Sequence, residues 1–186
     1  MGKVISFNMV TLDGFFAGPD GEIDWHHVDA EFNEFAIAQL DSAGGLLFGR
    51  VTYQLMASYW PTDMGMKDDP VVASKMNALP KIVFSKTLEK AEWNHTRLVK
   101  GNVAEEISRL KRQPGKDWFL FGSADLASTL TNYGLVDEYR VMVNPVVLGS
   151  GKPLFKGVKD KLDLKLASTK AFRSGNVLLS YQPDRR

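Results

Sequence analysis

The chain has 186 residues, 44% of them hydrophobic, which is enough for one domain with a full core. Lys and Arg (23) nearly balance Asp and Glu (22), and the net charge of +1 gives no support for a nucleic-acid partner. The absence of cysteine excludes disulfides, thiolate metal sites and cysteine nucleophiles, and no apolar run is long enough for a membrane span, so we expect a cytoplasmic protein without a membrane partner.

The first half of the chain alternates strands with helices. An apolar strand at residues 4–10 leads into a glycine-rich loop, and apolar residues at helical spacing from Val28 to Leu40 predict a helix that Gly44-Gly45 ends. A buried strand at 46–48 enters a helix at 51–56. Asp69 followed by Pro70 predicts a capped helix that runs to about Asn77.

The pattern changes after residue 135. Before that point we predict a strand at 81–85, a helix at 103–110, a strand at 117–121 and a helix that begins at 122–123. The residues 138–143 then alternate as in a half-buried strand, and the later segments LDLKLASTKAF and NVLLSYQ continue as strands. We therefore predict one α/β domain over residues 1–186, with a mixed, mostly parallel sheet and antiparallel strands at its C-terminal end.

Three strand-to-helix turns carry polar or small residues, in LLFGRVTY, KIVFSKT and WFLFGSADL. Open α/β sheets bind ligands at the carboxyl ends of their strands, so these turns would line one edge if the three strands are neighbours. Arg50 and Lys86 could then meet phosphates, and Gly122 would let the backbone approach a ligand closely.

These turns, together with FGSADLASTLTNYGLVDEYRVMVNPVVLGSGKPLF, resemble the dihydrofolate reductase superfamily, and more specifically the reductase domain of bacterial riboflavin-biosynthesis deaminase-reductases. The opening TLDGFFAG is similar to the first strand and loop of that family. The resemblance covers essentially the whole chain. It implies a three-layer dihydrofolate-reductase-like fold and an oxidoreductase that uses NADPH.

The resemblance also implies the cofactor contacts. Gly49, Arg50, Val51 and Thr52 would hold phosphates, with Arg50, Ser85 and Lys86 around the adenosine 2′-phosphate. The pyrophosphate would lie over Gly122, Ser123, Ala124 and Asp125, at a helix N-terminus. Met9, Phe16 and Ala17 would bracket the nicotinamide carboxamide.

Two acids are candidates for the catalytic role. Asp13 matches the acid of the family's first loop, and Glu31 lies about where folate reductases keep their active-site carboxylate, from which it could relay a proton. Each has a structural alternative: Asp13 as a turn residue before Gly14, and Glu31 as a favourable acid in a first helical turn. The adjacent His26 and His27 lack a third ligand, so we predict no metal site.

The chain departs from the family at three points. It has no zinc deaminase domain, Phe121 stands where folate reductases have the first of two glycines, and Asp24 precedes Trp25 where they have proline. The second difference leaves the geometry of the Phe121-Gly122 peptide open, and the third argues against folate as the substrate. We predict an NADPH-dependent reductase that transfers a hydride to a small carbonyl- or imine-containing, heterocyclic substrate.

Two alternative functions stay open. One is a true 5-amino-6-(5-phosphoribosylamino)uracil reductase or dihydrofolate reductase, and the other is a non-catalytic NADP(H)-binding protein that senses redox state. The strand-rich C-terminal third also predicts a homodimer, because exposed edge strands need covering.

Overall fold

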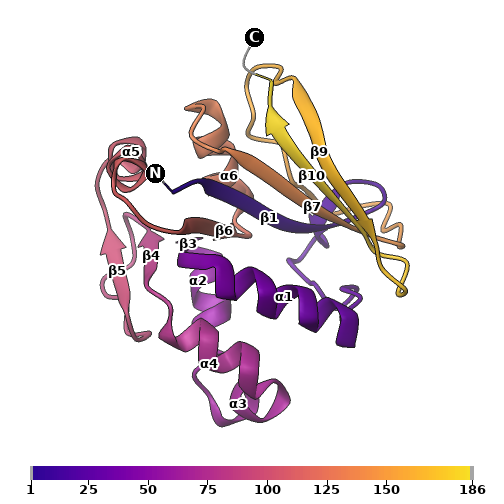
Figure 1. Cartoon of the computed structure of the whole chain (residues 1–186), viewed down its shortest axis with the longest axis horizontal. Helices are drawn as coiled ribbons and strands as arrows, with labels where there is room; N and C mark the ends of the chain where they lie inside the picture. The colour runs from indigo at the N-terminus through magenta and orange to yellow at the C-terminus, as the bar shows by residue number, and fades with distance from the viewer. Residues whose placement is uncertain (1, 185–186) are drawn as a thin grey trace.

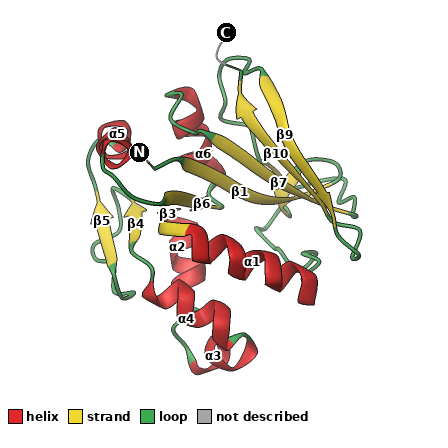
Figure 2. Ribbon diagram, viewed as in Figure 1, coloured by secondary structure: helices red, strands yellow, loops and turns green. Residues whose placement is uncertain are grey.

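A computed structural model describes residues 2–184, and it has three layers: one central sheet with helices on both faces (Figures 1 and 2). The helices are α1 (Ala30–Ser42), α2 (Arg50–Ala57), α3 (Asp63–Asp68), α4 (Pro70–Ala78), α5 (Val103–Arg112) and α6 (Ala124–Asn132). Apolar residues of α1, α2 and α4 pack on one face of the sheet, and those of α5 and α6 pack on the other. None of the helices within residues 2–184 combines the length and apolar character needed to cross a membrane.

The main sheet has eight strands in the order β5-β4-β3-β6-β1-β7-β10-β9. These strands are β1 (Val4–Thr11), β3 (Ala43–Gly49), β4 (Lys81–Phe84), β5 (Thr96–Val99), β6 (Asp117–Phe121), β7 (Glu138–Asn144), β9 (Leu164–Ala171) and β10 (Val177–Pro183). All pairs from β5 to β7 are parallel, and β10 and β9 are added antiparallel. The predicted fold class is confirmed, and β3 lies between β4 and β6, so the three predicted turns do share one edge.

Side-chain caps set the helix starts. Asp69 accepts a hydrogen bond from the Val72 N–H (3.0 Å), which confirms the predicted start of α4, and Asp29 caps α1 in the same way. The prediction for Gly44-Gly45 is wrong in detail, because both glycines belong to β3. A side chain on Gly45 would meet the Trp118 ring at 2.3 Å, so the glycine makes room for the neighbouring strand β6.

The predicted strand at 138–143 is confirmed as β7, but the prediction that it is half-buried is wrong. Strand β7 lies between β1 and β10, and Glu138, Met142 and Asn144 are buried although alternation would expose the first two. Four short elements had no clear sequence signal: α3, β5, and the two strands of a small separate sheet, β2 (Phe15–Ala17) and β8 (Lys152–Pro153). Such short segments gain their structure from tertiary pairing.

A buried lysine joins α4 to the sheet. Lys81 begins β4, is 1% exposed, and its Nζ donates to the carbonyl oxygens of Met76 (2.7 Å), Asn77 (3.1 Å) and Leu79 (2.7 Å). The same ammonium lies 4.5 Å from the centre of the Trp93 ring. Burial lowers the pKa of Lys81 to about 8, so the group is still charged near neutral pH and caps the C-terminus of α4.

Lys81→Met is expected to lower the free energy of unfolding by about 3 kcal/mol, because three buried carbonyl groups lose their donor. Chemical denaturation of both proteins measures the difference. Lys75→Met is the matched control: Lys75 pairs with Asp41 on the surface, and its loss should cost less than about 1 kcal/mol. Equal losses in the two variants would contradict the structural role of Lys81.

The edge strand β9 is exposed along its whole length, including Leu164 and Leu166. We propose that a second copy of the chain covers this edge, in keeping with the expected homodimer. Light scattering should then give about twice the chain mass of 20.7 kDa. Leu166→Asp should yield monomer, whereas Val147→Asp, at an exposed apolar residue outside β9, should not; a wild-type mass of one chain would contradict the proposal.

Candidate active site

A large cavity follows the edge formed by the carboxyl ends of β3, β4, β5 and β6. Its volume is about 1010 Å³, at the upper limit of ordinary small-molecule sites, so it has room for a dinucleotide and a second small ligand. The turns after all four strands line it, as do the inner faces of α1 and α4 and parts of the loops on either side of β2 and β8.

The β3–α2 and β6–α6 turns approach each other closely at the middle of the cavity. A side chain on Gly49 would lie 2.1 Å from Ser123 Oγ, and one on Gly122 would lie 2.9 Å from Thr52 Oγ1. The Thr52 hydroxyl accepts a hydrogen bond from the Ser123 N–H (3.0 Å), which fixes one turn to the other. Lack of space therefore requires both glycines, and the left-handed backbone at Gly122 (φ 62°) favours glycine there as well.

The helix ends at these turns are suited to an anion. Within the described part of the chain no side chain caps the N-terminus of α2, so the first backbone N–H groups of this helix remain free for a ligand. Before α6, Gly122 (φ 62°) and Ser123 (φ 51°) are both left-handed. This conformation costs a serine roughly 1 kcal/mol, and such strain is typical of ligand-binding turns.

One end of the cavity carries positive charge. Arg50, Lys86 and Lys100 line it, all three are exposed, and none of them forms an ion pair with another described residue. Arg50 donates a long hydrogen bond to Gln54 Oε1 (3.3 Å), one turn further along the same helix. A phosphate group at this end would gain charge-assisted hydrogen bonds.

Lys100 and the adjacent Gly101 were missed by the sequence analysis. They follow β5 in TRLVKGN and repeat the pattern of a short apolar strand followed by a polar turn and a helix cap, here Asn102. The segment before the turn is only four residues long, too short for its period to identify it as a strand.

The structure brings all the predicted cofactor residues to this cavity. Those that line it are Met9, Phe16, Ala17, Gly49, Arg50, Val51, Thr52, Ser85, Lys86, Gly122, Ser123, Ala124 and Asp125. Their contacts with a cofactor stay predictions.

The two predicted catalytic acids do not line the cavity. Asp13 accepts hydrogen bonds from the backbone N–H groups of Gly149 (2.8 Å) and Leu148 (3.2 Å), and so ties the first loop to the loop after β7. A hydrogen bond with the Thr11 side chain, together with these N–H groups, holds the pKa of Asp13 below its ordinary value. This is the role of a turn residue that we gave as its alternative.

Glu31 lies in the first turn of α1 but faces the β9–β10 turn. Its Oε2 accepts from the Arg173 N–H (2.9 Å), and its Oε1 lies 3.8 Å from Lys170 Nζ. Residues 32, 33, 35, 36, 39 and 40 of the same helix line the cavity, whereas the Glu31 carboxylate is held at the β9–β10 turn by these contacts. Because neither acid lines the cavity, we do not propose them as catalytic groups.

His26, for which we predicted no metal role, lies in the loop before α1 and lines the cavity. Its ring packs edge-on against Trp25 (centroids 4.5 Å apart), and its Nε2 is buried without a hydrogen-bond partner. The next residue is fixed on both sides: the His27 N–H donates to Asn144 Oδ1 and its carbonyl accepts from Asn176 Nδ2. Within residues 2–184 no group of three or more His, Asp or Glu side chains could hold a metal ion.

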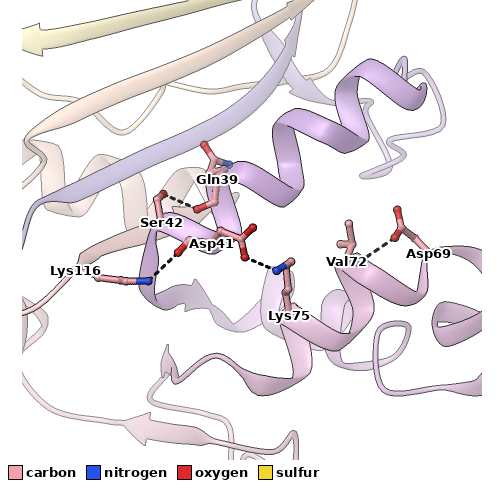
Figure 3. Close-up of polar contacts among 7 residues, drawn as sticks. All are labelled: Gln39, Asp41, Ser42, Asp69, Val72, Lys75 and Lys116. Atoms are coloured by element: carbon pink, nitrogen blue, oxygen red, sulfur yellow. Dashed lines mark hydrogen bonds and ion pairs between the residues drawn. The ribbon is translucent and has the colours of Figure 1, made fainter.

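Helices α1 and α4, two walls of the cavity, are joined on their outer side. Asp41 of α1 pairs with Lys75 of α4, and its backbone carbonyl accepts from Lys116 Nζ (2.8 Å), as Figure 3 shows. At the other end of α4, Asp69 lines the cavity but its carboxylate is occupied by the Val72 N–H (Figure 3). The ion pair therefore keeps the charge of Lys75 outside the cavity.

Comparison with known proteins agrees with this geometry. Residues 2–178 match the family model described as the RibD C-terminal domain. The chain belongs to the RibD C-terminal domain family. It is 40% identical to the uncharacterized protein YyaP of Bacillus subtilis (strain 168) over 181 residues, which cover 96% of this chain and 94% of that protein.

Solved structures share the fold of this RibD C-terminal domain protein. A putative riboflavin biosynthesis protein from Shewanella sp. PV-4 superposes with a TM-score of 0.77 at 23% identity, covering 98% of this chain and 99% of that one. Dihydrofolate reductase from Enterococcus faecalis, solved in complex with NADP(H), gives 0.64 at 15% identity over 98% and 97% of the two chains. The predicted relationship to the dihydrofolate-reductase-like fold is confirmed.

His26 should make stability depend on pH. Burial lowers its pKa to about 4, against about 6.5 in an unfolded chain, so between these values the unfolded state binds a proton that the folded state does not. The stability that comes from the neutral His26 ring is fully present above pH 6.5, and it is lost as the pH falls toward 4. Between about pH 7.5 and about pH 5 this one group should remove about 2 kcal/mol of unfolding free energy.

Denaturation of wild type and His26→Phe at the two pH values tests this, because phenylalanine keeps the ring and cannot titrate. The loss on acidification should be about 2 kcal/mol smaller in the variant. His27→Phe, at the exposed neighbouring histidine, should behave as wild type. A His26→Phe protein with the wild-type pH dependence would show that the ring is not held neutral.

Proposed function

We propose that this protein is an NADPH-dependent reductase of a small heterocyclic compound with a carbonyl or imine group. The observation that carries the proposal is the order of chemical features along the cavity. Three cations that form no ion pair with residues 2–184 lie at one end, free helix N–H groups and the Gly122-Ser123 turn lie in the middle, and an apolar region lies beyond them.

This order fits the cofactor group by group. A 2′-phosphate would meet Arg50, Lys86 and Lys100. A pyrophosphate would lie over the N-termini of α2 and α6. A Cβ on Gly49 would fill the space between these two helix ends. The nicotinamide ring would lie near Met9 and the Phe16-Ala17 backbone. NADPH supplies a hydride when bound, and the protein holds the acceptor carbon next to it. The family and the neighbour solved with NADP(H) support the choice of cofactor.

The non-catalytic alternative, an NADP(H)-binding protein that senses redox state, is favoured by one observation. The acids that line the cavity are Asp69, which caps α4, and Asp125, in the first turn of α6. Neither Asp13 nor Glu31 is available there to relay a proton. A reductase would then need another source for the proton, whereas a binding protein would need none.

Tryptophan fluorescence during titration with NADPH and NADH tests the cofactor site, with Trp60 in the cavity as a reporter. Wild type should bind NADPH at least tenfold more tightly than NADH. Arg50→Ala should weaken NADPH binding by tenfold or more and NADH binding by less than about twofold, since a charge-assisted hydrogen bond contributes about 1.5–3 kcal/mol. Arg112→Ala, an exposed arginine at the end of α5, is the matched control and should change neither affinity.

Absence of binding by both cofactors would contradict the proposal and its alternative together. With binding established, loss of NADPH absorbance upon addition of carbonyl and imine heterocycles separates the two. Turnover with any member supports the reductase, and a complete lack of turnover across the set favours the non-catalytic protein.

A further inference from the structure

A lysine lines the cavity beside the residues that are expected to hold the nicotinamide. Lys152 begins β8 and pairs directly with Ala17 of β2, and both residues line the cavity together with Phe16. Residues that pair across two antiparallel strands lie side by side. Because the backbone of Phe16 and Ala17 is expected to bracket the nicotinamide carboxamide, Lys152 belongs to the same end of the proposed site.

Contacts with the first loop fix the backbone that carries this lysine. A side chain on Gly151 would lie 2.5 Å from the carbonyl oxygen of Ala17, so β8 approaches β2 more closely than a residue with a Cβ would allow. Asp13 accepts hydrogen bonds from the backbone N–H groups of residues 148 and 149, just before β8. The exposed side chain of Lys152 therefore starts from a defined position.

The ammonium group of Lys152 is available to a ligand. Its Nζ lies 3.3 Å from the position that a Cβ on Gly21 would take, so the side chain extends along the first loop. Lys152 forms no ion pair with any residue from 2 to 184. Glu22, an acid of the same loop, accepts a hydrogen bond from the Asp20 N–H instead (2.9 Å).

The other cations that line the cavity lie at different places. Three of them follow the strand ends, where the cofactor phosphates are expected: Arg50, Lys86 and Lys100. Lys156 is next to Gly157, where a Cβ would lie 2.8 Å from the Ser128 Cβ, so Lys156 belongs to the α6 side. Among residues 2–184, Lys152 is therefore the cavity cation that strand pairing places at the nicotinamide end.

The proposed reduction needs a proton as well as a hydride. When the carbon of a carbonyl or imine takes a hydride, the electron pair of the double bond moves to the oxygen or nitrogen, which then takes a proton. The acids of the cavity lie at helix starts: Asp69 accepts from the Val72 N–H, and Asp125 is in the first turn of α6. Burial lowers the pKa of His26 to about 4, so this ring is neutral near pH 7 and does not act as an acid there.

We propose that Lys152 is the proton donor of this reduction. Its Nζ donates a hydrogen bond to the carbonyl oxygen or imine nitrogen of the substrate and stabilises the negative charge that develops there. Nζ then releases a proton to that atom, and the neutral amine that remains takes a proton from water, which reaches the exposed side chain. The inference rests on the proposed reductase function and assigns the proton that this function requires.

Acetylation of lysines with N-hydroxysuccinimidyl acetate, measured by mass spectrometry, tests the position of Lys152 without turnover. Adenosine 2′,5′-bisphosphate fills only the adenosine end and should slow acetylation of Lys86 and Lys100, but not of Lys152. Saturating NADP⁺ should slow all three, by about tenfold or more at Lys152, since an occupied site is shielded from the reagent. Lys159, exposed and outside the cavity, is the control and should react equally throughout.

Two substitutions separate proton donation from a simple ionic contact. Lys152→Met removes the charge and the proton, whereas Lys152→Arg keeps the charge but cannot release a proton. With a heterocycle that the wild type reduces, kcat should fall by at least about tenfold in both variants, while NADPH affinity changes little. Lys159→Met should keep the wild-type kcat.

The outcomes distinguish the role of Lys152 from the proposed function itself. Equal acetylation of Lys152 with and without bound NADP⁺, or a wild-type kcat in Lys152→Arg, would overturn the role of Lys152 alone. Lack of NADP⁺ binding by the wild type, or lack of turnover with every heterocycle, would instead be a failure of the proposed reductase.

Discussion

The site depends on the close approach of two strand-to-helix turns. The parallel pairing of β3 with β6 brings both turns to one edge, and the gap between them is closed by the hydrogen bond from the Ser123 N–H to Thr52 Oγ1. Gly49 and Gly122 are the residues that permit this distance, because any Cβ would collide with the opposite turn. If either turn moved outward, the N-termini of α2 and α6 would no longer lie side by side in the cavity. The strained backbone of Ser123 is held in place by this same contact.

Much of this edge could be predicted from the sequence because it depends on local patterns. Short apolar strands followed by Gly-Arg, Ser-Lys or Gly-Ser indicate turns at a ligand-binding edge, and the parallel topology follows from the alternation of strands and helices. The turn at Lys100 has the same pattern and was missed only because its strand is four residues long. The burial of β7 could not be predicted, because it depends on the position of β7 between β1 and β10.

The orientation of single side chains could not be predicted from the sequence. Glu31 is in the expected first turn of α1, but the sequence does not show toward which neighbour its side chain points. In the structure the carboxylate points to the β9–β10 turn, where it accepts a hydrogen bond from the Arg173 N–H. Asp13 is in the expected loop, but its oxygens point at the backbone of residues 148 and 149. Both acids hydrogen-bond to the backbone of loops, and in this way they help to fix the position of these loops.

The walls of the cavity are built by different means, and this has a consequence for specificity. Along the strand edge the wall consists of backbone turns, where the position of N–H groups and glycines leaves little freedom to change. The wall formed by α1 and α4 consists of side chains, and side chains can differ between proteins that share one backbone. A change of specificity therefore needs new side chains on these helix faces, while the turns at the strand edge stay the same.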